Sequence, residues 1–340
     1  MPAAGWRFRR LALRSLRSTE ANVHAFLDPL RLAVSVPQAT ALLLRERPAA
    51  IFTTGGYVAV PVLMAAAPLG IPVVLWDGNV IPGRAVRTTA RLADVLTVSF
   101  AATCRALADA APGRPCYLTG TPIRDTRVID RAAARQRMGV APDDRVVLIF
   151  GGSQAVRRFN AAVAGALPRL VEQVAVIHVT GEDGYAAALT SREALPDARR
   201  SRYRPHPFLR DDMLAALSAA DLIIGRAGSS TLAEVTALGT PMVVVPYPHA
   251  AGHQRANAAT LVEAGAARLV EDEAFDADAL LAAAAILDDP ATHASMSSAA
   301  RSLGRPAAAD AVADLVLAAA RRAPLPDTAT IDRRSRGVPA

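Results

Sequence analysis

Lysine is absent from this chain of 340 residues, so all 38 side chains counted as Lys and Arg are arginines. Without lysine the chain has no Walker A loop for nucleotide phosphates, and it cannot form a Schiff base, including the lysine linkage to pyridoxal phosphate. The two cysteines, Cys104 and Cys116, are too few for a disulfide framework and lack the spacing of a zinc site. This cysteine usage fits a cytoplasmic protein.

Aromatic residues are also scarce, at 4% of the chain. No basic groove interleaved with aromatic side chains and no zinc-finger motif accompanies the net charge of +7. We therefore expect no nucleic acid partner.

Long apolar runs without a break are missing as well. The uncharged stretch from Val58 to Trp76 is interrupted by proline and glycine, at Pro61, Pro68, Gly70 and Pro72. We expect a buried helix over Pro61–Ala67 and a central strand over Ile71–Leu75 in its place. Neither a signal peptide nor a transmembrane helix is expected.

The N-terminal segment alternates apolar and basic residues. The apolar residues are Trp6, Phe8, Leu11, Leu13 and Leu16, and the basic residues are Arg7, Arg9, Arg10, Arg14 and Arg17. This pattern is typical of a segment that rests on an anionic membrane surface. A solvated basic face beside a domain core is the alternative.

Apolar strands alternate with longer helical patterns along the chain, as in doubly wound α/β proteins. The length predicts two domains, and a hydrophobic content of 52% is enough for two cores. The predicted strands are Ala50–Thr53, Val73–Leu75, Val95–Val98, Val146–Phe150, Val174–His178, Leu222–Ile224 and Met242–Val245. The predicted helices are Pro37–Arg47, Asn160–Gln173, Asp211–Ala219, Ser230–Leu238, Gln254–Ala264, Asp276–Asp288 and Pro306–Arg321.

The sequence around Gly228 predicts a site for a phosphate group. After the strand Leu222–Ile224, a helix opens with three hydroxyl side chains, Ser229, Ser230 and Thr231. Small residues let a phosphate approach the free backbone N–H groups, and the helix dipole favours its charge. Glu234 lies one turn further along, where a carboxylate suits a ribose diol. Plain N-capping of the helix is the alternative interpretation of this turn.

Two further segments complete the predicted pocket. The strand Val146–Phe150 leads into the turn Gly151-Gly152-Ser153, which frees backbone N–H groups beside a ligand. A second strand, Pro241–Pro246, leads into a polar loop that carries His253, Gln254 and Asn257. A phosphate cradle, a diol-binding acid and an amide-bearing loop together predict a nucleotide-sugar site at the carboxyl ends of parallel strands.

The order of these motifs resembles the donor domain of the MurG family, within glycosyltransferase family 28. The similar residues are Phe208 to Met213, Ala220-Asp221, Gly228, Thr231, Glu234, Gly239-Thr240-Pro241, Val245-Pro246, His253-Gln254, Asn257-Ala258 and Glu263 to Ala267. Upstream, Ile149 to Gln154 resembles the family's glycine-rich turn, and Gly120 to Arg124 resembles its interdomain segment. Thr54-Gly55-Gly56-Tyr57 and Asn79 to Gly83 resemble loops on the acceptor side. The resemblance runs from about Phe8 to about Leu317.

This resemblance implies an α/β protein of the GT-B type, in which two Rossmann-like doubly wound domains face each other, here with an incomplete N-terminal domain. Residues 1–122 are assigned to the acceptor and membrane side and residues 123–305 to the domain that binds the UDP-sugar donor. Residues 306–322 are expected to pack back on the first domain as a helix. Residues 323–340, rich in Pro, Arg, Asp and Thr, are expected to form a disordered tail.

The resemblance also implies an inverting hexosyltransferase of cell wall biogenesis, with roles in cell shape and division. It would transfer N-acetylglucosamine from UDP-N-acetylglucosamine to an undecaprenyl-linked muramyl pentapeptide, lipid I, giving lipid II. Such an enzyme would lie peripherally on the cytoplasmic face of the membrane. Neither a cofactor nor a metal is expected, because the pocket loops carry no Asp-x-Asp cluster and arginine with a helix N-terminus can stabilise the diphosphate.

The implied site residues divide by the part of the substrate they contact. We expect the diphosphate at Arg124, Ser153, Ser229, Ser230 and Thr231, the ribose at Glu234, uracil at the backbone near Leu209, and the sugar hydroxyls at His253 and Gln254. Gly228 would also belong to the donor site, and Asn79 would face the sugar and the acceptor. The acceptor side would use Thr54, Gly55 and Gly56. Asp77 is the candidate general base, since the loop that usually supplies one in the family has no counterpart here.

That missing loop is the main departure from the family pattern. The family opens with an apolar strand and a Gly-rich loop that ends in Gly-Gly-His, whereas Met1 aligns well inside the first domain. A parallel sheet without its central strand would expose apolar edges, so we expect an in-frame extension upstream of Met1 and low activity without it. A damaged or repurposed relative that binds a UDP-sugar without turnover is the alternative.

Two other enzyme classes fit the sequence less well. A nonhydrolysing epimerase of UDP-N-acetylglucosamine uses the same donor, but it would need paired carboxylates and a His in the cleft, where mainly Glu234 and Asp77 occur. A nicotinamide dehydrogenase is disfavoured because Gly151-Gly152-Ser153 is not Gly-x-Gly-x-x-Gly. His178 and His206 are interpreted as structural residues.

Overall fold

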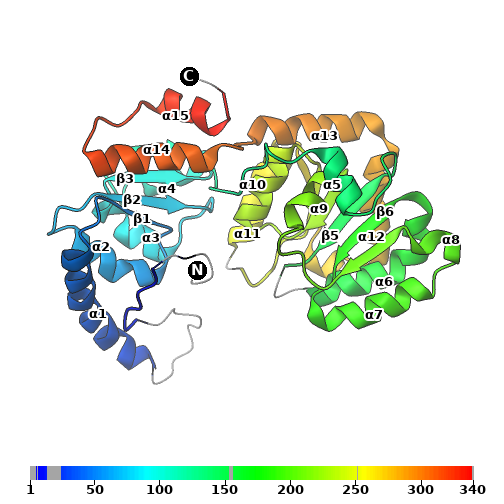
Figure 1. The fold of residues 1–340 in the computed structure, drawn as a ribbon, viewed down its shortest axis with the longest axis horizontal. Helices are drawn as coiled ribbons and strands as arrows, with labels where there is room; N and C mark the ends of the chain where they lie inside the picture. The colour runs from blue at the N-terminus through cyan, green and yellow to red at the C-terminus, as the bar shows by residue number, and fades with distance from the viewer. Residues whose placement is uncertain (1–4, 6, 14–23, 153–155, 251, 339–340) are drawn as a thin grey trace. The chain divides into compact units, whose positions relative to one another are not determined.

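The structure is a computed structural model that describes residues 5, 7–13, 24–152, 156–250 and 252–338, with the side chains of 24–30 left out (Figure 1). The chain divides into two compact units. The first combines Met1–Gly120 with Asp310–Ala340, and the second is Thr121–Ala309. Each unit is an α/β structure built on one parallel sheet, as the sequence predicted.

The sheet of the first unit has the strand order β1-β2-β3-β4. Its strands are β1 (Ile51–Thr53), β2 (Val73–Asp77), β3 (Val95–Val98) and β4 (Cys116–Leu118), and its helices include α1 (His24–Glu46), α2 (Val60–Ala66), α3 (Arg84–Thr89) and α4 (Ala101–Leu107). The central strands β2 and β3 are apolar throughout most of their length because helices cover both of their faces. Side chains from α1 to α4 pack on one face around Leu75 and Leu96.

The opposite face of this sheet is covered by the C-terminal part of the chain. Helix α14 (Ala308–Arg321) and helix α15 (Thr328–Ser335) bury Leu315 and Ile331 against Val74, Val95 and Tyr117. The Tyr117 hydroxyl also donates to the carbonyl of Pro326 at 2.9 Å.

The expected disordered tail at residues 323–340 is therefore wrong as far as residue 338. Asp327 caps α15 by accepting from the backbone N–H of Thr330 at 2.8 Å, and Ile331 is 1% exposed. The apolar side chain of Ile331 packs the largely polar helix α15 against the apolar face of the first sheet. The segment was predicted to be disordered because it is rich in Pro, Arg, Asp and Thr.

The two cysteines form one disulfide, which the sequence analysis did not predict. Cys104 lies on α4 and Cys116 begins β4, and their Cα atoms are 5.9 Å apart. Helix α4 packs against β4, the strand that follows it. This packing brings Cys104 and Cys116, which are 12 residues apart in the sequence, close together. This proximity depends on the sheet pairing, which cysteine counting does not reveal.

The sheet of the second unit has six parallel strands in the order β10-β9-β8-β5-β6-β7. The strands are β5 (Val146–Phe150), β6 (Ala175–Val179), β7 (Tyr203–His206), β8 (Leu222–Gly225), β9 (Met242–Val244) and β10 (Ala267–Leu269). The sequence did not predict β4, β7 or β10. These strands have only three or four residues, and polar residues such as Arg204 and Arg268 interrupt β7 and β10.

Helices cover both faces of this second sheet (Figure 1). They are α5 (Arg131–Arg137), α6 (Val156–Gln173), α7 (Glu182–Glu193), α8 (Asp197–Arg200), α9 (Met213–Ala219), α10 (Ser229–Leu238), α11 (His253–Glu263), α12 (Ala277–Ala284) and α13 (Pro290–Leu303). One core contains side chains of α9, α10 and α11, and the other contains side chains of α6 and α12. The helix predicted over Pro61–Ala67 is confirmed as α2, and within the described residues no helix is long and apolar enough to cross a membrane.

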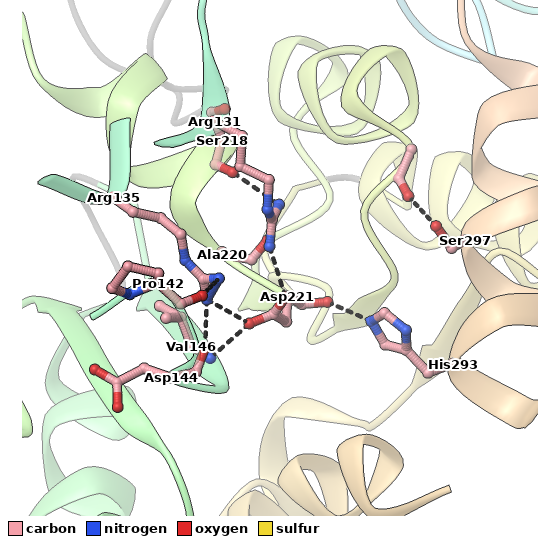
Figure 2. Close-up of polar contacts among 11 residues, drawn as sticks. Arg131, Arg135, Pro142, Asp144, Val146, Ser218, Ala220, Asp221, His293 and Ser297 are labelled. Carbon is pink, nitrogen blue, oxygen red and sulfur yellow. Dashed lines mark hydrogen bonds and ion pairs between the residues drawn. The ribbon is translucent and has the colours of Figure 1, made fainter. Parts of the chain in front are cut away.

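An ion-pair cluster fixes the amino end of β8 (Figure 2). Asp221 precedes this strand, and its two carboxylate oxygens lie 2.6 Å from Arg131 and 3.0 Å from Arg135. The same carboxylate accepts from the backbone N–H of Val146 at 2.8 Å, so it joins β5 to β8. His293 of α13 bonds the Asp221 carbonyl at 2.9 Å. Because the two arginines are four residues apart on α5, one helix face supplies both partners.

Candidate functional site

The chain direction in the second sheet changes between β5 and β8. From β5 the chain proceeds to β6 and β7 on one side, and it then returns to β8 and continues to β9 and β10 on the other. Ligands of open α/β sheets bind outside the carboxyl ends of the strands at such a switch point. Here these ends carry the two glycine-containing turns that the sequence predicted, since Phe150 of β5 pairs with Gly225 of β8.

Glycine is favoured at the end of β8 because the two strands come close together. A Cβ atom at Gly225 would lie 3.1 Å from the carbonyl oxygen of Phe150. On β5, the turn continues through Gly152, whose φ of +70° is a left-handed conformation that favours glycine. Ser153, expected to bind the diphosphate, lies outside the described residues.

The helix that follows β8 begins with uncapped N–H groups. Gly228 is the N-cap of α10, in an extended conformation, and no side chain forms a capping hydrogen bond there. The alternative interpretation, N-capping of the helix by a side chain, is therefore wrong for this turn. The first N–H groups of a ten-residue helix can instead be satisfied by an anion.

The three hydroxyl groups at this helix start differ in their surroundings. Ser229 Oγ lies 2.9 Å from Thr121 Oγ1, and either atom can be the donor. Ser230 is exposed, and Thr231 is half-buried. The structure thus places all three at the first turn of α10, with Ser229 also tied to the first residue of the unit.

Glu234 and Arg124 form an ion pair. The Nε atom of Arg124 lies 3.0 Å from Oε1 of Glu234, and their side chains are 46% and 11% exposed. Burial raises the pKa of Glu234, and the Arg124 charge and hydrogen bond oppose that rise. The sequence predicted these residues as contacts to different parts of a nucleotide. The structure brings them together at α10, where Glu234 lies one turn after Ser230 on the same side of the helix.

Arg226 is a structural residue at this site whose role the sequence analysis did not predict. It is 7% exposed and donates to the carbonyls of Val245 and Pro246 at 3.1 and 3.2 Å. Its guanidinium pairs with Asp272 at 2.6 Å and stacks on Tyr247 and Phe159. Arg226 therefore holds the carboxyl ends of β8 and β9 together. The position of Arg226 directly after an apolar strand was the one feature of the sequence that could have indicated a buried structural role.

The polar loop after β9 is held by Gln254. Its Oε1 accepts from the backbone N–H of Tyr247 at 2.9 Å, while His253 begins α11 after Gly252. Leu209, predicted near uracil, is buried in the core with 7% exposure, so its backbone is firmly placed. The structure thus assigns Gln254 a loop-forming role in addition to the predicted contact with the sugar.

The predicted acceptor residues lie at the carboxyl ends of two paired strands of the first unit. Thr54, Gly55 and Gly56 follow β1, and Asp77 ends β2. A Cβ atom at Gly55, where φ is +69°, would lie 2.4 Å from Val86, so only glycine fits there. Asp77 is 4% exposed and accepts from the N–H of Asn79 at 2.9 Å. Asp77 therefore shapes the loop that carries Asn79, and its role as a base stays a prediction.

Two histidines that the sequence analysis set aside are placed in structural surroundings. His178 on β6 bonds the hydroxyl of Tyr203 on β7 at 2.9 Å, and burial lowers the pKa of His178 to about 3. Burial also lowers the pKa of His206. In the described part of the chain, no group of three or more His, Cys, Asp and Glu side chains is arranged to hold a metal.

Comparison with known proteins follows the same two-part division. The N-terminal domain model of glycosyltransferase family 28 matches residues 1–97, and its C-terminal domain model matches residues 146–313. A relative from Gloeobacter violaceus is 39% identical over 278 residues, which span 81% of this chain and 75% of the relative. It is named UDP-N-acetylglucosamine–N-acetylmuramyl-(pentapeptide) pyrophosphoryl-undecaprenol N-acetylglucosamine transferase.

The chain belongs to the MurG family. The solved structure of Acinetobacter baumannii MurG matches it with a TM-score of 0.68 and 29% identity, covering 85% of this chain and 79% of that one. A UDP-GlcNAc 2-epimerase from Neisseria meningitidis matches with a TM-score of 0.62 but only 12% identity, over 89% of this chain and 84% of that one. The epimerase therefore shares the fold, whereas the MurG relatives share the sequence. The predicted GT-B fold class and glycosyltransferase family are confirmed.

Proposed function

We propose that this chain transfers N-acetylglucosamine from UDP-N-acetylglucosamine to the undecaprenyl-linked muramyl pentapeptide lipid I, which gives lipid II in peptidoglycan synthesis. The observation that carries the donor half is the uncapped start of α10 at the switch point, one turn before the Arg124–Glu234 pair. The relatives named for this reaction support both halves.

The donor diphosphate would bind at the first turn of α10. The backbone N–H groups after Gly228 and the hydroxyls of Ser229, Ser230 and Thr231 are all suited to donate to phosphate oxygens. Uracil would lie near Leu209, and His253 and Gln254 would bind the sugar hydroxyls. Ser153 would add a donor from the turn after β5.

Nucleotide binding would rearrange the Arg124–Glu234 pair. A carboxylate accepts hydrogen bonds from a ribose diol, and a guanidinium donates to phosphate oxygens. Since the Arg124 side chain is 46% exposed, it can leave Glu234 at little cost in solvation. The same two side chains then contact ribose and diphosphate separately.

The transfer step would proceed with inversion at the anomeric carbon. The acceptor hydroxyl attacks this carbon as the bond to the UDP oxygen breaks, and negative charge develops on the leaving diphosphate. The α10 dipole, its N–H groups and Arg124 would stabilise that charge without a metal or cofactor. Asp77 would take the proton from the attacking hydroxyl, and Asn79 with Thr54, Gly55 and Gly56 would position the sugar and acceptor.

A lipid-linked acceptor requires access to a membrane. The segment Arg7 to Arg10 combines exposed arginines with Phe8, which is 54% exposed, and the Arg10 guanidinium lies 5.9 Å from its ring. Gln38 of α1 holds this segment through hydrogen bonds to Arg10 and Ala12. These contacts support peripheral binding to an anionic membrane surface at its cytoplasmic face.

The test is transfer of labelled N-acetylglucosamine to lipid I, with and without EDTA. We expect labelled lipid II in both, and roughly 7- to 80-fold less with the Glu234→Ala variant at a donor concentration near the wild-type KM. Activity that disappears in EDTA and returns with Mg²⁺ would disprove the metal-free mechanism. Formation of UDP-N-acetylmannosamine without any acceptor would show an epimerase instead.

A further inference from the structure

Three arginines converge on a cavity in the first unit, and none of the proposed site residues lines it. The cavity has a volume of about 320 Å³ and lies where the chain enters β2, β3 and β4. Arg91 comes from the turn of helix before β3, Arg114 precedes β4, and Arg322 follows α14. Segments far apart in the sequence therefore supply the same kind of side chain to one space.

Contacts within the unit hold two of these arginines in place. Arg322 donates to the carbonyl of Gly70 at 2.9 Å. Arg114 lies 3.4 Å from the Asp94 carboxylate and donates to the carbonyl of Arg91 at 3.3 Å. The other oxygen of Asp94 accepts from the N–H of Val73 at 2.9 Å. The disulfide at Cys116 anchors the strand that follows Arg114. Contacts within the unit thus shape the cavity wall.

The charges around this cavity are not balanced. Three guanidinium groups face a single carboxylate, Asp94, which leaves two positive charges in excess. Among the described residues, the Arg91 guanidinium forms no hydrogen bond or ion pair. Arginine is always charged, so this excess persists at every physiological pH.

A second cavity, in the other unit, has an excess of carboxylates instead. It has about 310 Å³ and lies beside the Asp221 cluster (Figure 2). Its arginines, Arg135 and Arg145, are paired with Asp221 and Asp288. Asp143 and Asp144 add further negative charge. An anion would be repelled there, whereas the cavity at Arg91 attracts one.

We propose that the cavity at Arg91 binds a phosphate group, either free or as the headgroup of a phospholipid. Guanidinium groups donate paired hydrogen bonds to phosphate oxygens, and a tetrahedral anion can accept them from several directions. A volume of 320 Å³ equals that of roughly ten water molecules, which is enough for phosphate and a small organic group. The two excess charges match a phosphate dianion.

This site is distinct from the proposed acceptor site. Thr54 to Gly56 and Asp77 follow the carboxyl ends of β1 and β2, whereas Arg91, Asp94 and Arg114 precede the amino ends of β3 and β4. Because all strands of this sheet are parallel, their amino ends and their carboxyl ends lie on opposite sides of the sheet. The proposal therefore does not depend on the proposed transferase reaction.

The test uses Ile71, which lines the cavity, as a local probe. The protein is labelled at isoleucine δ-methyl groups and titrated with inorganic phosphate, and the Ile71 signal alone is followed because Ile71 lies at this cavity. We expect the Ile71 resonance to shift with saturation. Arg91→Gln should weaken this binding about 10- to 100-fold, the effect of losing a charged hydrogen-bond donor.

Matched controls separate a local site from general charge. Arg169→Gln removes the same charge from α6 of the other unit, where the side chain is 71% exposed, and should leave the Ile71 titration unchanged. Sodium chloride at equal ionic strength should not shift Ile71. Because Arg91 forms no side-chain bond to the described residues, its variant should keep the wild-type circular dichroism.

Two arms distinguish the sources of phosphate. A shift with inorganic phosphate that Arg91→Gln weakens supports a free anion. A shift only with short-chain phosphatidylglycerol, again weakened by Arg91→Gln, supports a lipid headgroup. An Ile71 resonance unmoved by both probes, or equal affinities in wild type and Arg91→Gln, overturns the proposal.

Discussion

The two ends of β8 carry arginine–carboxylate contacts of opposite kinds. At the amino end, Asp221 uses both carboxylate oxygens, on Arg131, Arg135 and the N–H of Val146. At the carboxyl end, beyond the turn, Glu234 has one ion pair, to the half-exposed Arg124. The strand between them has four residues, so at ~3.3 Å per residue the ends are about 13 Å apart.

The difference indicates how a structural cluster and a binding site can be told apart. The Asp221 arginines also donate to backbone carbonyls, those of Ser218 and Ala220 from Arg131 and that of Pro142 from Arg135. No ligand could replace these partners without breaking the fold. The Arg124–Glu234 pair stands beside an uncapped helix start, and within the described residues neither side chain is hydrogen-bonded to the backbone. The predictions below test this contrast.

The largest expected effect is on stability, from Asp221→Ala. The change leaves Arg135, whose side chain is 11% exposed, with an uncompensated charge, and removes the acceptor of the Val146 N–H. Losing one partner of a buried pair costs 3–5 kcal/mol, and since Arg131 is half-exposed we expect about 3 kcal/mol of unfolding free energy. Urea unfolding followed by circular dichroism measures it, because neither of the two tryptophans lies in the second unit.

Asp288→Ala is the matched control. Asp288 pairs with Arg145 at 2.7 Å, but the two side chains are 50% and 43% exposed, so the loss should be below about 1 kcal/mol. Folded Asp221→Ala protein should still bind UDP with wild-type affinity. Equal stability losses in the two variants would refute the view that the amino end is a structural cluster.

Few of the contacts at the amino end of β8 could be predicted from the sequence. Ala220-Asp221 could be recognised as a family motif, but nothing local indicated that Asp221 joins β5 to α5. Its partners are 75 to 90 residues away, and such contacts exist only once the strand order is known. For the same reason the disulfide was not predicted and the segment of α15 was wrongly predicted to be disordered, since both depend on sheet pairing.

The second prediction concerns donor binding. Glu234→Ala should weaken UDP-sugar binding by about 1.5–3 kcal/mol, because a hydrogen bond between the ribose diol and a charged acceptor is lost. Stability should change little, since the partner Arg124 is half-exposed. Isothermal calorimetry measures the affinity. Glu234→Gln, which keeps one acceptor, should lie between the two, and identical affinities for wild type and Glu234→Ala would remove Glu234 from the ribose site.

A smaller effect is expected from Ser229→Ala. If the Ser229 hydroxyl donates to a phosphate oxygen, its loss should cost about 1 kcal/mol, roughly fivefold in affinity for UDP. Thr121→Val serves as the control, because it removes the hydroxyl that lies 2.9 Å from Ser229 Oγ and leaves the Ser229 hydroxyl in place. Should Thr121→Val weaken binding as much as Ser229→Ala, Ser229 would be a structural residue.

The carboxyl end could be predicted better than the amino end because its signals are local. A strand, small residues and a helix start within a dozen positions identified the turn at Gly228 and the helix carrying Glu234. What stayed hidden was again long-range: the pairing of Arg124 with Glu234, and the burial of Arg226 beneath the loop after β9. The fold class followed from periodicity, whereas partner choice required the structure.

The smallest expected effect is a pH dependence at the carboxyl end of β8. Burial raises the pKa of Glu234 above its usual 4.5, and Arg124 opposes this rise. The protonated acid contributes stability that is fully present below the unfolded pKa and is lost as pH rises through the folded value. Donor binding has the opposite trend, because a ribose diol needs the carboxylate as acceptor, so affinity for UDP should increase as pH rises from 4.5.

Arg124→Gln sharpens this prediction. Without the guanidinium, the pKa of Glu234 is raised further, so the midpoint of the affinity curve should move to higher pH. Calorimetry across pH, with Glu234→Gln as a variant that has no carboxyl group to titrate, isolates the effect from other groups. A midpoint that is the same in wild type and Arg124→Gln would mean that the ion pair does not control Glu234. The carboxyl end would then be as fixed as the Asp221 cluster, and the contrast between the two ends of β8 would be lost.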